Sequence, residues 1–273
     1  MKTQLKNRGI GLIRPKKGRL AFGEPARENL SSQVERSIRD ALMSARFHPG
    51  EHLNIRALAE MLGTSATPIR EALFRLTAEH AIEMHPGHSA KVPVIDADQY
   101  AELCLIRKAI EGFAAEMAAT RISTGELTQL GTVLKRFNTA CDNSQFDQTL
   151  SLSREFRFGV YRAAQMPTLM RIIEGLWLRS GPTFRILSLV NDPELGITYQ
   201  HTLDALARRD GNGARRAIED AISLGSGRLM KYLEEQPKEG SIAPRKERRV
   251  RRLVRPGAKS ADTPFAAFAP RSR

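Results

Sequence analysis

Apolar residues in the first third of the chain recur with helical spacing in three short segments separated by turn residues. Pro49-Gly50 ends the first segment, and Gly63-Thr64-Ser65 separates the second from the third. Ser31 and Ser32 are the predicted caps of the first helix, and Ser65 is the predicted cap of the third. The apolar positions are Val34, Ile38, Ala41, Leu42 and Ala45, then Ile55, Leu58, Ala59 and Leu62, then Ile69, Leu73 and Leu76.

Two short strands are predicted after the third helix. Residues 82–84 and 90–92 flank the turn segment His85-Pro86-Gly87-His88-Ser89, a pattern that indicates a hairpin. Two helices joined by a tight turn and followed by a hairpin form a winged helix-turn-helix. We expect this domain to span residues 31–94.

The rest of the chain favours helices throughout. After a linker at residues 93–98, breaks fall near Met166-Pro167, Asp192-Pro193 and the glycines at 211–213, which predicts an all-α domain over 98–236 with about six helices of bundle length. Ser123 with Glu126, and Ser144 with Asp147, have capping-box spacing. The predicted inward stripe of the first of these helices is Leu103, Ile106, Ile110, Phe113 and Met117. The predicted fold class is therefore mainly α.

The formal net charge of +13 lies at the two ends of the chain. Residues 1–30 contribute +6 and residues 237–273 contribute +8, which leaves −1 for residues 31–236. We expect two basic disordered tails around a nearly neutral folded body. Such tails can neutralise DNA phosphates, but their charge alone does not identify a DNA-binding protein.

Cysteine usage and hydropathy indicate the compartment. Cys104 and Cys141 lack disulfide-like or metal-binding spacing, which is typical of a reducing environment. No apolar run approaches the roughly 18 residues of a membrane span, and the basic N-terminus lacks the apolar stretch of a signal peptide. We expect a cytoplasmic protein with no membrane partner.

The segment from Pro49 to Val92 resembles the N-terminal domain of the GntR family of bacterial regulators. The pieces that carry the resemblance are Pro49-Gly50, Leu58-Ala59-Glu60, the turn at 63–65 and the run Pro68-Ile69-Arg70-Glu71-Ala72-Leu73. The helical remainder resembles the effector-binding FCD domain of the fatty-acid-regulator-like branch, through Arg107, Glu111 and Glu155-Phe156.

A helix-turn-helix of this kind places the N-terminal end of its second helix in the major groove of DNA. Arg70 is the candidate for reading bases, and its alternative role is an ion pair with Glu71 or Glu60. The resemblance further implies DNA contacts by Arg56, Ser65, Thr67, Gly87 and His88. Ala66 departs from the family, because relatives usually carry Arg there, so the operator differs or the basic tails supply phosphate contacts instead.

The resemblance also implies a metal site of one Asp and three His in many FCD domains. Here the corresponding positions are Ser153, Arg157, His201 and a position near Ala221, and five of the six histidines lie at or before residue 88. One His cannot hold Zn²⁺ or Ni²⁺, so we expect no metal and no cofactor.

Arg157 suggests a metal-free anion pocket instead. Arg107 and Arg157 would grip the acid group of a small carboxylate or sugar-acid effector, with His201 and Ser153 donating hydrogen bonds and Tyr161 or Trp177 packing on its apolar part. The alternative is that Arg157 pairs with a buried acid such as Glu111 and the pocket binds nothing.

No catalytic motif is visible in the sequence, so we expect no enzyme. We expect a homodimer, because two-fold symmetry matches a palindromic operator in double-stranded DNA. The predicted function is a sequence-specific transcription regulator, with repression modulated by a small organic acid. The alternative is an effector-independent or architectural DNA-binding protein whose helical domain only dimerises.

Overall fold

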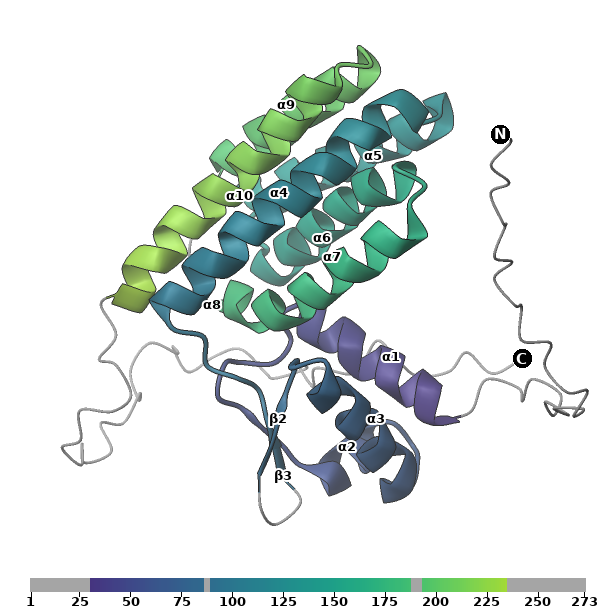
Figure 1. The fold of residues 1–273 in the computed structure, drawn as a ribbon, viewed down its shortest axis with the longest axis vertical. Coiled ribbons are helices and arrows are strands. Elements are labelled where there is room, and N and C mark those ends of the chain that lie inside the picture. The colour runs from purple at the N-terminus through teal and green to yellow at the C-terminus, as the bar shows by residue number, and fades with distance from the viewer. Residues whose placement is uncertain (1–29, 86–88, 188–192, 235–273) are drawn as a thin grey trace, which may run out of the picture.

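The computed structural model describes residues 30–85, 89–187 and 193–234. The N-terminal domain comprises helices α1 to α3 and a small sheet, and the helical domain comprises α4 to α10; Figure 1 shows the first beneath the second. Elements of the N-terminal domain are α1 (Leu30–Met43), β1 (His52–Leu53), α2 (Ile55–Met61), α3 (Ala66–Ala78), β2 (Glu83–His85) and β3 (Ser89–Lys91). Those of the helical domain are α4 (Ala97–Arg121), α5 (Thr124–Asp142), α6 (Phe146–Ala163), α7 (Pro167–Ser180), the 3-10 turn η1 (Gly181–Thr183), α8 (Phe184–Leu187), α9 (Pro193–Ala207) and α10 (Gly211–Glu234).

The mainly α architecture and the winged helix-turn-helix are confirmed. β2 and β3 form the predicted antiparallel hairpin, and β1, which the sequence pattern did not predict, pairs with the outer side of β3 through His52 and Lys91. β1 has only two residues, too few for an alternating pattern to be visible. Its pairing anchors the hairpin to the start of α2.

The six long helices of the described helical domain, α4 to α7 with α9 and α10, match the predicted bundle. α4 lies against α10 and α6, and α9 packs on α10 and α5. Asp96 caps α4 with Gln99, and Ser123 caps α5 with Glu126 as predicted. No helix of the described residues is long and apolar enough to span a membrane.

Two predictions of helix caps were wrong, and a third was confirmed only in position. Ser31 and Ser32 lie inside the first turn of α1 rather than before it, and Gln145, not Ser144, precedes the first residue of α6. The Ser65 residue does occupy the position before α3, but its side chain makes no capping hydrogen bond. Ser and Thr occur both in first turns and at caps, so spacing alone does not fix which role a given residue takes.

The predicted inward stripe of α4 was also wrong in part. Leu103 is buried, but Ile106 is 38% exposed, and Ile110, Phe113 and Met117 are only partly buried. The fully buried face carries Tyr100, Arg107 and Glu111 together with small alanines. An apolar periodicity cannot locate a face on which two of the buried residues are charged.

The two domains share one continuous core. α1 packs against α3 within its own domain and against α7 and η1 of the helical domain, and Figure 1 shows it lying below α7. Gly181 lies very close to the end of α1: a Cβ there would lie 2.6 Å from the carbonyl oxygen of Leu42. The absence of a side chain at Gly181 therefore permits this contact between the domains.

Candidate nucleic-acid interface and ligand cavity

The N-terminal domain presents an exposed polar surface around the start of α3. Arg70 and Thr67 on α3 and Arg56 on α2 are all exposed. Within the part of the chain that the structure describes, neither arginine forms an ion pair, and Arg70 has none with Glu60 or Glu71. Both guanidinium groups are therefore available to donate hydrogen bonds to an external acceptor, such as a phosphate or a base edge.

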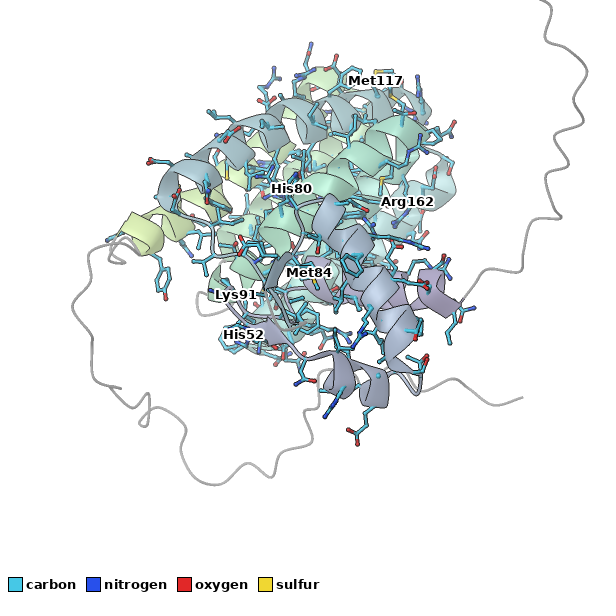
Figure 2. All side chains as sticks on the ribbon, turned by 60° about the horizontal axis from the view of Figure 1, so that its bottom comes forward. His52, His80, Met84, Lys91, Met117 and Arg162 are labelled. Atoms are coloured by element: carbon cyan, nitrogen blue, oxygen red, sulfur yellow. The ribbon has the colours of Figure 1, made fainter. Side chains whose placement is uncertain are left out.

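The local structure holds this surface in place. Asn54 caps α2 by accepting hydrogen bonds from the backbone N–H groups of Arg56 and Ala57. α3 is tied to α1 by Arg75 to Glu35 (3.1 Å) and by Glu79 to Arg39. Figure 2, which views this end of the molecule, shows His52 and Lys91 together at the sheet. Gly87 and His88, the predicted wing contacts, lie outside the described residues.

The helical domain contains a cavity of about 110 Å³ at its junction with the N-terminal domain. Its charged lining residues among those described are all arginines: Arg107 of α4, Arg157 of α6 and Arg228 of α10. Ser153, Tyr199 and Trp177 supply polar atoms, and most of the remaining wall is apolar. The cavity is therefore an electropositive site with a largely apolar body.

A buried carboxylate organises two of these arginines. Glu111, fully buried, accepts hydrogen bonds from Arg107 Nε at 2.6 Å, from Trp177 Nε1 at 3.1 Å and from the Tyr161 hydroxyl. Arg157 Nη1 lies 3.5 Å from the same carboxylate, at the limit of a hydrogen bond. The single carboxylate of Glu111 is thus the partner of two buried guanidinium groups.

Arg157 is held mainly by Tyr199. Its Nε donates to the Tyr199 hydroxyl at 3.1 Å, and that hydroxyl is 2.7 Å from Ser153 Oγ. Its guanidinium also lies over the rings of Trp177 and Tyr199, 5.9 and 5.8 Å from their centroids. Among the described residues, Arg157 Nη2 and Arg107 Nη1 have no hydrogen-bond partner.

Protonation of the cluster follows from these contacts. Burial by itself lowers the pKa of Arg157, but Tyr199, Tyr161 and Glu111 raise it further than burial lowers it. The pKa of Arg107 is likewise raised, because Glu111 outweighs burial. Burial, reinforced by Glu111, raises the pKa of Tyr161 well above its usual value. Both arginines are therefore charged and Tyr161 neutral at physiological pH.

Comparison with known proteins gives the family. Residues 30–92 match the profile of the bacterial regulatory proteins of the gntR family, and residues 102–223 match that of the FCD domain. The HTH-type transcriptional regulator McbR of Escherichia coli is 32% identical over 204 residues, which cover 73% of this chain and 92% of McbR. The chain belongs to the GntR family. It is a DNA-binding transcriptional regulator with an FCD domain, not an enzyme.

Other relatives agree with this assignment. The HTH-type transcriptional repressor RspR of Escherichia coli is 27% identical over 193 residues, covering 69% of this chain and 84% of RspR. The solved structure of E. coli McbR/YncC superposes with a TM-score of 0.71 at 30% identity, covering 75% of this chain and 98% of that one. A putative GntR regulator from Rhodococcus sp. RHA1 shares the fold at a TM-score of 0.61 and 16% identity, covering 74% of this chain and 97% of that one.

This GntR-family chain departs from the FCD metal site in its donor set. Of the four positions expected there, Ser153, Arg157 and Ala221 line the cavity, whereas His201 is exposed and lies off its wall. A guanidinium repels a divalent cation, so these residues do not fit one. No group of three or more His, Cys, Asp or Glu in the described chain could hold a metal ion.

Sequence reasoning missed Tyr199, which occupies the place expected for His201. The two residues are two positions apart on α9 and thus about 200° apart around the helix. Tyr199, Thr202 and Leu206 are buried at spacings of three and four residues, a pattern that could have shown which face of α9 points inward. The role of Glu111 as the shared partner of two arginines was anticipated only as the alternative to ligand binding.

Proposed function

We propose that this regulator is a homodimeric repressor whose binding to operator DNA is modulated by a small organic acid held in the cavity of the helical domain. In this proposal the N-terminal domain (31–94) contacts DNA through Arg56, Ser65, Thr67 and Arg70, with Gly87 and His88 at the wing. The helical domain (98–236) binds the acid through Arg107, Arg157 and Ser153.

The charge of the cavity carries the proposal. Arg107 and Arg157 are 2% and 5% exposed, and Glu111 is the buried carboxylate that they share. An isolated buried charge is costly unless it is paired. A carboxylate ligand would supply the second negative charge and accept the hydrogen bonds that Arg157 Nη2 and Arg107 Nη1 leave unused.

A ligand can change DNA binding only if it binds one arrangement of the protein better than the other. In a dimer, the spacing of the two recognition helices must match the spacing of the operator half-sites. Ligand binding that changes this spacing therefore changes operator affinity.

The test measures operator release by acids and by their uncharged counterparts. An operator fragment is first selected from random DNA by the purified protein, and its binding is followed by fluorescence anisotropy at fixed salt. We expect benzoate and octanoate to weaken DNA binding, and benzamide and octanamide to have no effect. If acid and amide weaken DNA binding equally, or if neither has an effect, the proposal that an acid is the effector is wrong.

Two variants on the same helix, α6, distinguish binding of the acid in the cavity from a general effect of lost positive charge. Loss of a hydrogen bond to a charged group costs about 1.5–3 kcal/mol, so Arg157→Gln should weaken binding of the acid about 10- to 100-fold. Arg162→Gln removes the same charge from an exposed position of α6 outside the cavity and should leave the response unchanged. In cells, loss of the protein should raise transcription from a reporter that carries the operator.

A further inference from the structure

Part of the cavity wall belongs to the N-terminal domain. Met43, Ser44 and Ala45, at the C-terminal end of α1, line the cavity together with residues of α6, α9 and α10. The same end of α1 packs against η1, where Leu42 and Met43 approach Gly181 so closely that a Cβ there would lie 2.6 and 2.9 Å from them. A molecule in the cavity is therefore next to both domains.

Arg154 fixes the end of α1 to the helix that carries the cavity arginine. Its Nη2 donates to Asp40 Oδ1 and its Nη1 donates to Ser44 Oγ, both at 2.7 Å. Ser44 directly follows the last residue of α1, and its N–H donates to the carbonyl of Asp40, four residues earlier, at 3.0 Å. The two residues therefore lie on the same side of the helix axis. Arg154 lies between Ser153 and Arg157 on α6, so one helix contacts α1 and lines the cavity within a single turn.

The backbone at the end of α1 is strained. Ala45 is buried and has a φ of 53°, in the left-handed region that favours glycine. The N–H groups of Ala45 and Arg46 donate to the carbonyls of Leu42 and Ala41 at 3.1 and 3.0 Å. A non-glycine residue keeps this conformation only when its surroundings impose it, and here the surroundings include the cavity.

The position of α1 determines the position of the recognition helix. α1 and α3 pack together, and Arg75 to Glu35 and Arg39 to Glu79 join them at two points. The two helices thus form a unit that includes Arg70. A displacement at the end of α1 would move the DNA-binding surface with it.

We propose that Met43 to Ala45 form part of the ligand-binding site, so that one ligand contacts both domains. Its carboxylate would lie at Arg157 and its apolar body against Met43 and Ala45, while Arg154 acts as a positioning residue that links α6 to α1. This inference rests on the proposed function of the cavity. It makes α1 the element through which the ligand acts on DNA binding.

The volume of the cavity sets the size of the ligand. One water needs about 10–15 Å³ of such space, so 110 Å³ admits roughly seven to eleven water-sized groups. The wall beyond the arginines is largely apolar. The ligand class is therefore a monocarboxylic acid of about seven to eleven non-hydrogen atoms with an aromatic or aliphatic body. Acetate would fill only the arginine end.

The experiment uses the full chain and its single tryptophan, Trp177, which lines the cavity. Trp177 fluorescence gives the Kd of octanoate and of acetate, each with and without operator DNA. The ratio of the two octanoate constants is the coupling factor between ligand and DNA. We expect octanoate to couple to DNA binding, and acetate to bind weakly without coupling.

Two kinds of variant distinguish the role of Met43 in the cavity wall from the role of Arg154 and Asp40 in linking α6 to α1. Removal of apolar contact area by Met43→Ala should weaken octanoate binding about 3- to 10-fold and leave acetate binding unchanged. Met117→Ala, in the half of α4 beyond the cavity, should leave the binding of both acids unchanged. Arg154→Met, and Asp40→Asn on the opposite side, should leave octanoate binding to the DNA-free protein within about twofold and bring the coupling factor close to one.

The outcomes separate this inference from the function on which it rests. If Met43→Ala, Arg154→Met and Asp40→Asn all behave as wild type while Arg157→Gln weakens octanoate binding as expected, the cavity binds acids without help from α1 and the inference is wrong. If neither acid alters Trp177 fluorescence or DNA binding in the wild-type protein, the proposed function fails and the inference fails with it.

Discussion

The arginines of the two domains lie in opposite environments. Arg56 and Arg70 are exposed on the N-terminal domain and have no ion-pair partner among the described residues. Arg107 and Arg157 are buried in the helical domain and share Glu111. Water solvates the exposed pair, whereas the buried pair has lost its hydration.

This difference in burial determines how strongly a substitution at each site changes the stability of the fold. An exposed arginine can be replaced with little effect on stability, because water solvates its charge. A buried arginine depends on its carboxylate partner, and two that share one partner leave the site short of negative charge. We therefore expect substitutions in the N-terminal surface to change DNA affinity alone, and substitutions in the buried cluster to change stability as well.

The largest effect is expected from Glu111→Gln. The change is nearly isosteric but leaves Arg107 and Arg157 without a carboxylate, and breaking a buried pair costs about 3–5 kcal/mol. For a protein of this size the melting temperature should fall by about 6–20 °C, measured by calorimetry. Glu116→Gln, which removes the half-exposed pair with Arg215, should cost no more than about 1 kcal/mol. Equal losses in the two variants would contradict the contrast between buried and exposed charge.

The next effect concerns DNA rather than stability. Arg70→Ala should weaken operator binding by about 1–3 kcal/mol for each half-site and leave the melting temperature unchanged. Arg179→Ala removes an exposed positive charge from α7 of the helical domain and should not change specific binding. Anisotropy titrations over a range of salt concentrations measure both, and a uniform loss on operator and random DNA would assign Arg70 to phosphate contact instead.

The same contrast explains how far the sequence could predict the structure. In the N-terminal domain the apolar periodicity, the turns at 49–50 and 63–65 and the hairpin signal all agreed, and the exposed residues Arg56, Thr67 and Arg70 lie on the surface as expected. Exposed contacts at fixed positions of a helix follow from local sequence alone. Only the two-residue strand β1 and the details of the helix caps were missed.

In the helical domain, local sequence was not sufficient. The apolar stripe expected on α4 was shifted because its buried face carries Arg107 and Glu111, and His201 was expected where Tyr199 lies. The cluster joins residues of α4, α6, α7 and α9. Periodicity within one helix says which face is apolar but not which polar groups from other helices meet there.

The contact between the domains can be tested with a pair of glycines. Gly181→Ala would place a Cβ 2.6 Å from the backbone oxygen of Leu42, and such overpacking costs about 1–3 kcal/mol. Gly175→Ala, in α7 with no atom within 4 Å of the new Cβ, should stabilise the protein by about 0.5–1 kcal/mol. Denaturant unfolding measures both. A neutral Gly181→Ala would mean that α1 and η1 can separate without loss.

The smallest effect distinguishes the starts of the two helices of the helix-turn-helix, α2 and α3. Asn54 accepts two backbone hydrogen bonds at the start of α2, whereas Ser65 stands at the equivalent position of α3 with no capping bond. Loss of a working cap costs about 0.5–2 kcal/mol, so Asn54→Ala should lower the free energy of unfolding by that amount.

Ser65→Ala should cost less than about 0.5 kcal/mol, because no capping bond is lost. The Ser65 hydroxyl is exposed at the N-terminus of the recognition helix, where a helix binds phosphate readily. Ser65→Ala should therefore weaken operator binding more than it lowers stability, with urea unfolding and anisotropy measured on the same preparation. A stability loss as large as that of Asn54→Ala would mean that Ser65 caps α3 in solution, and its hydroxyl would then be engaged within the protein rather than available to DNA.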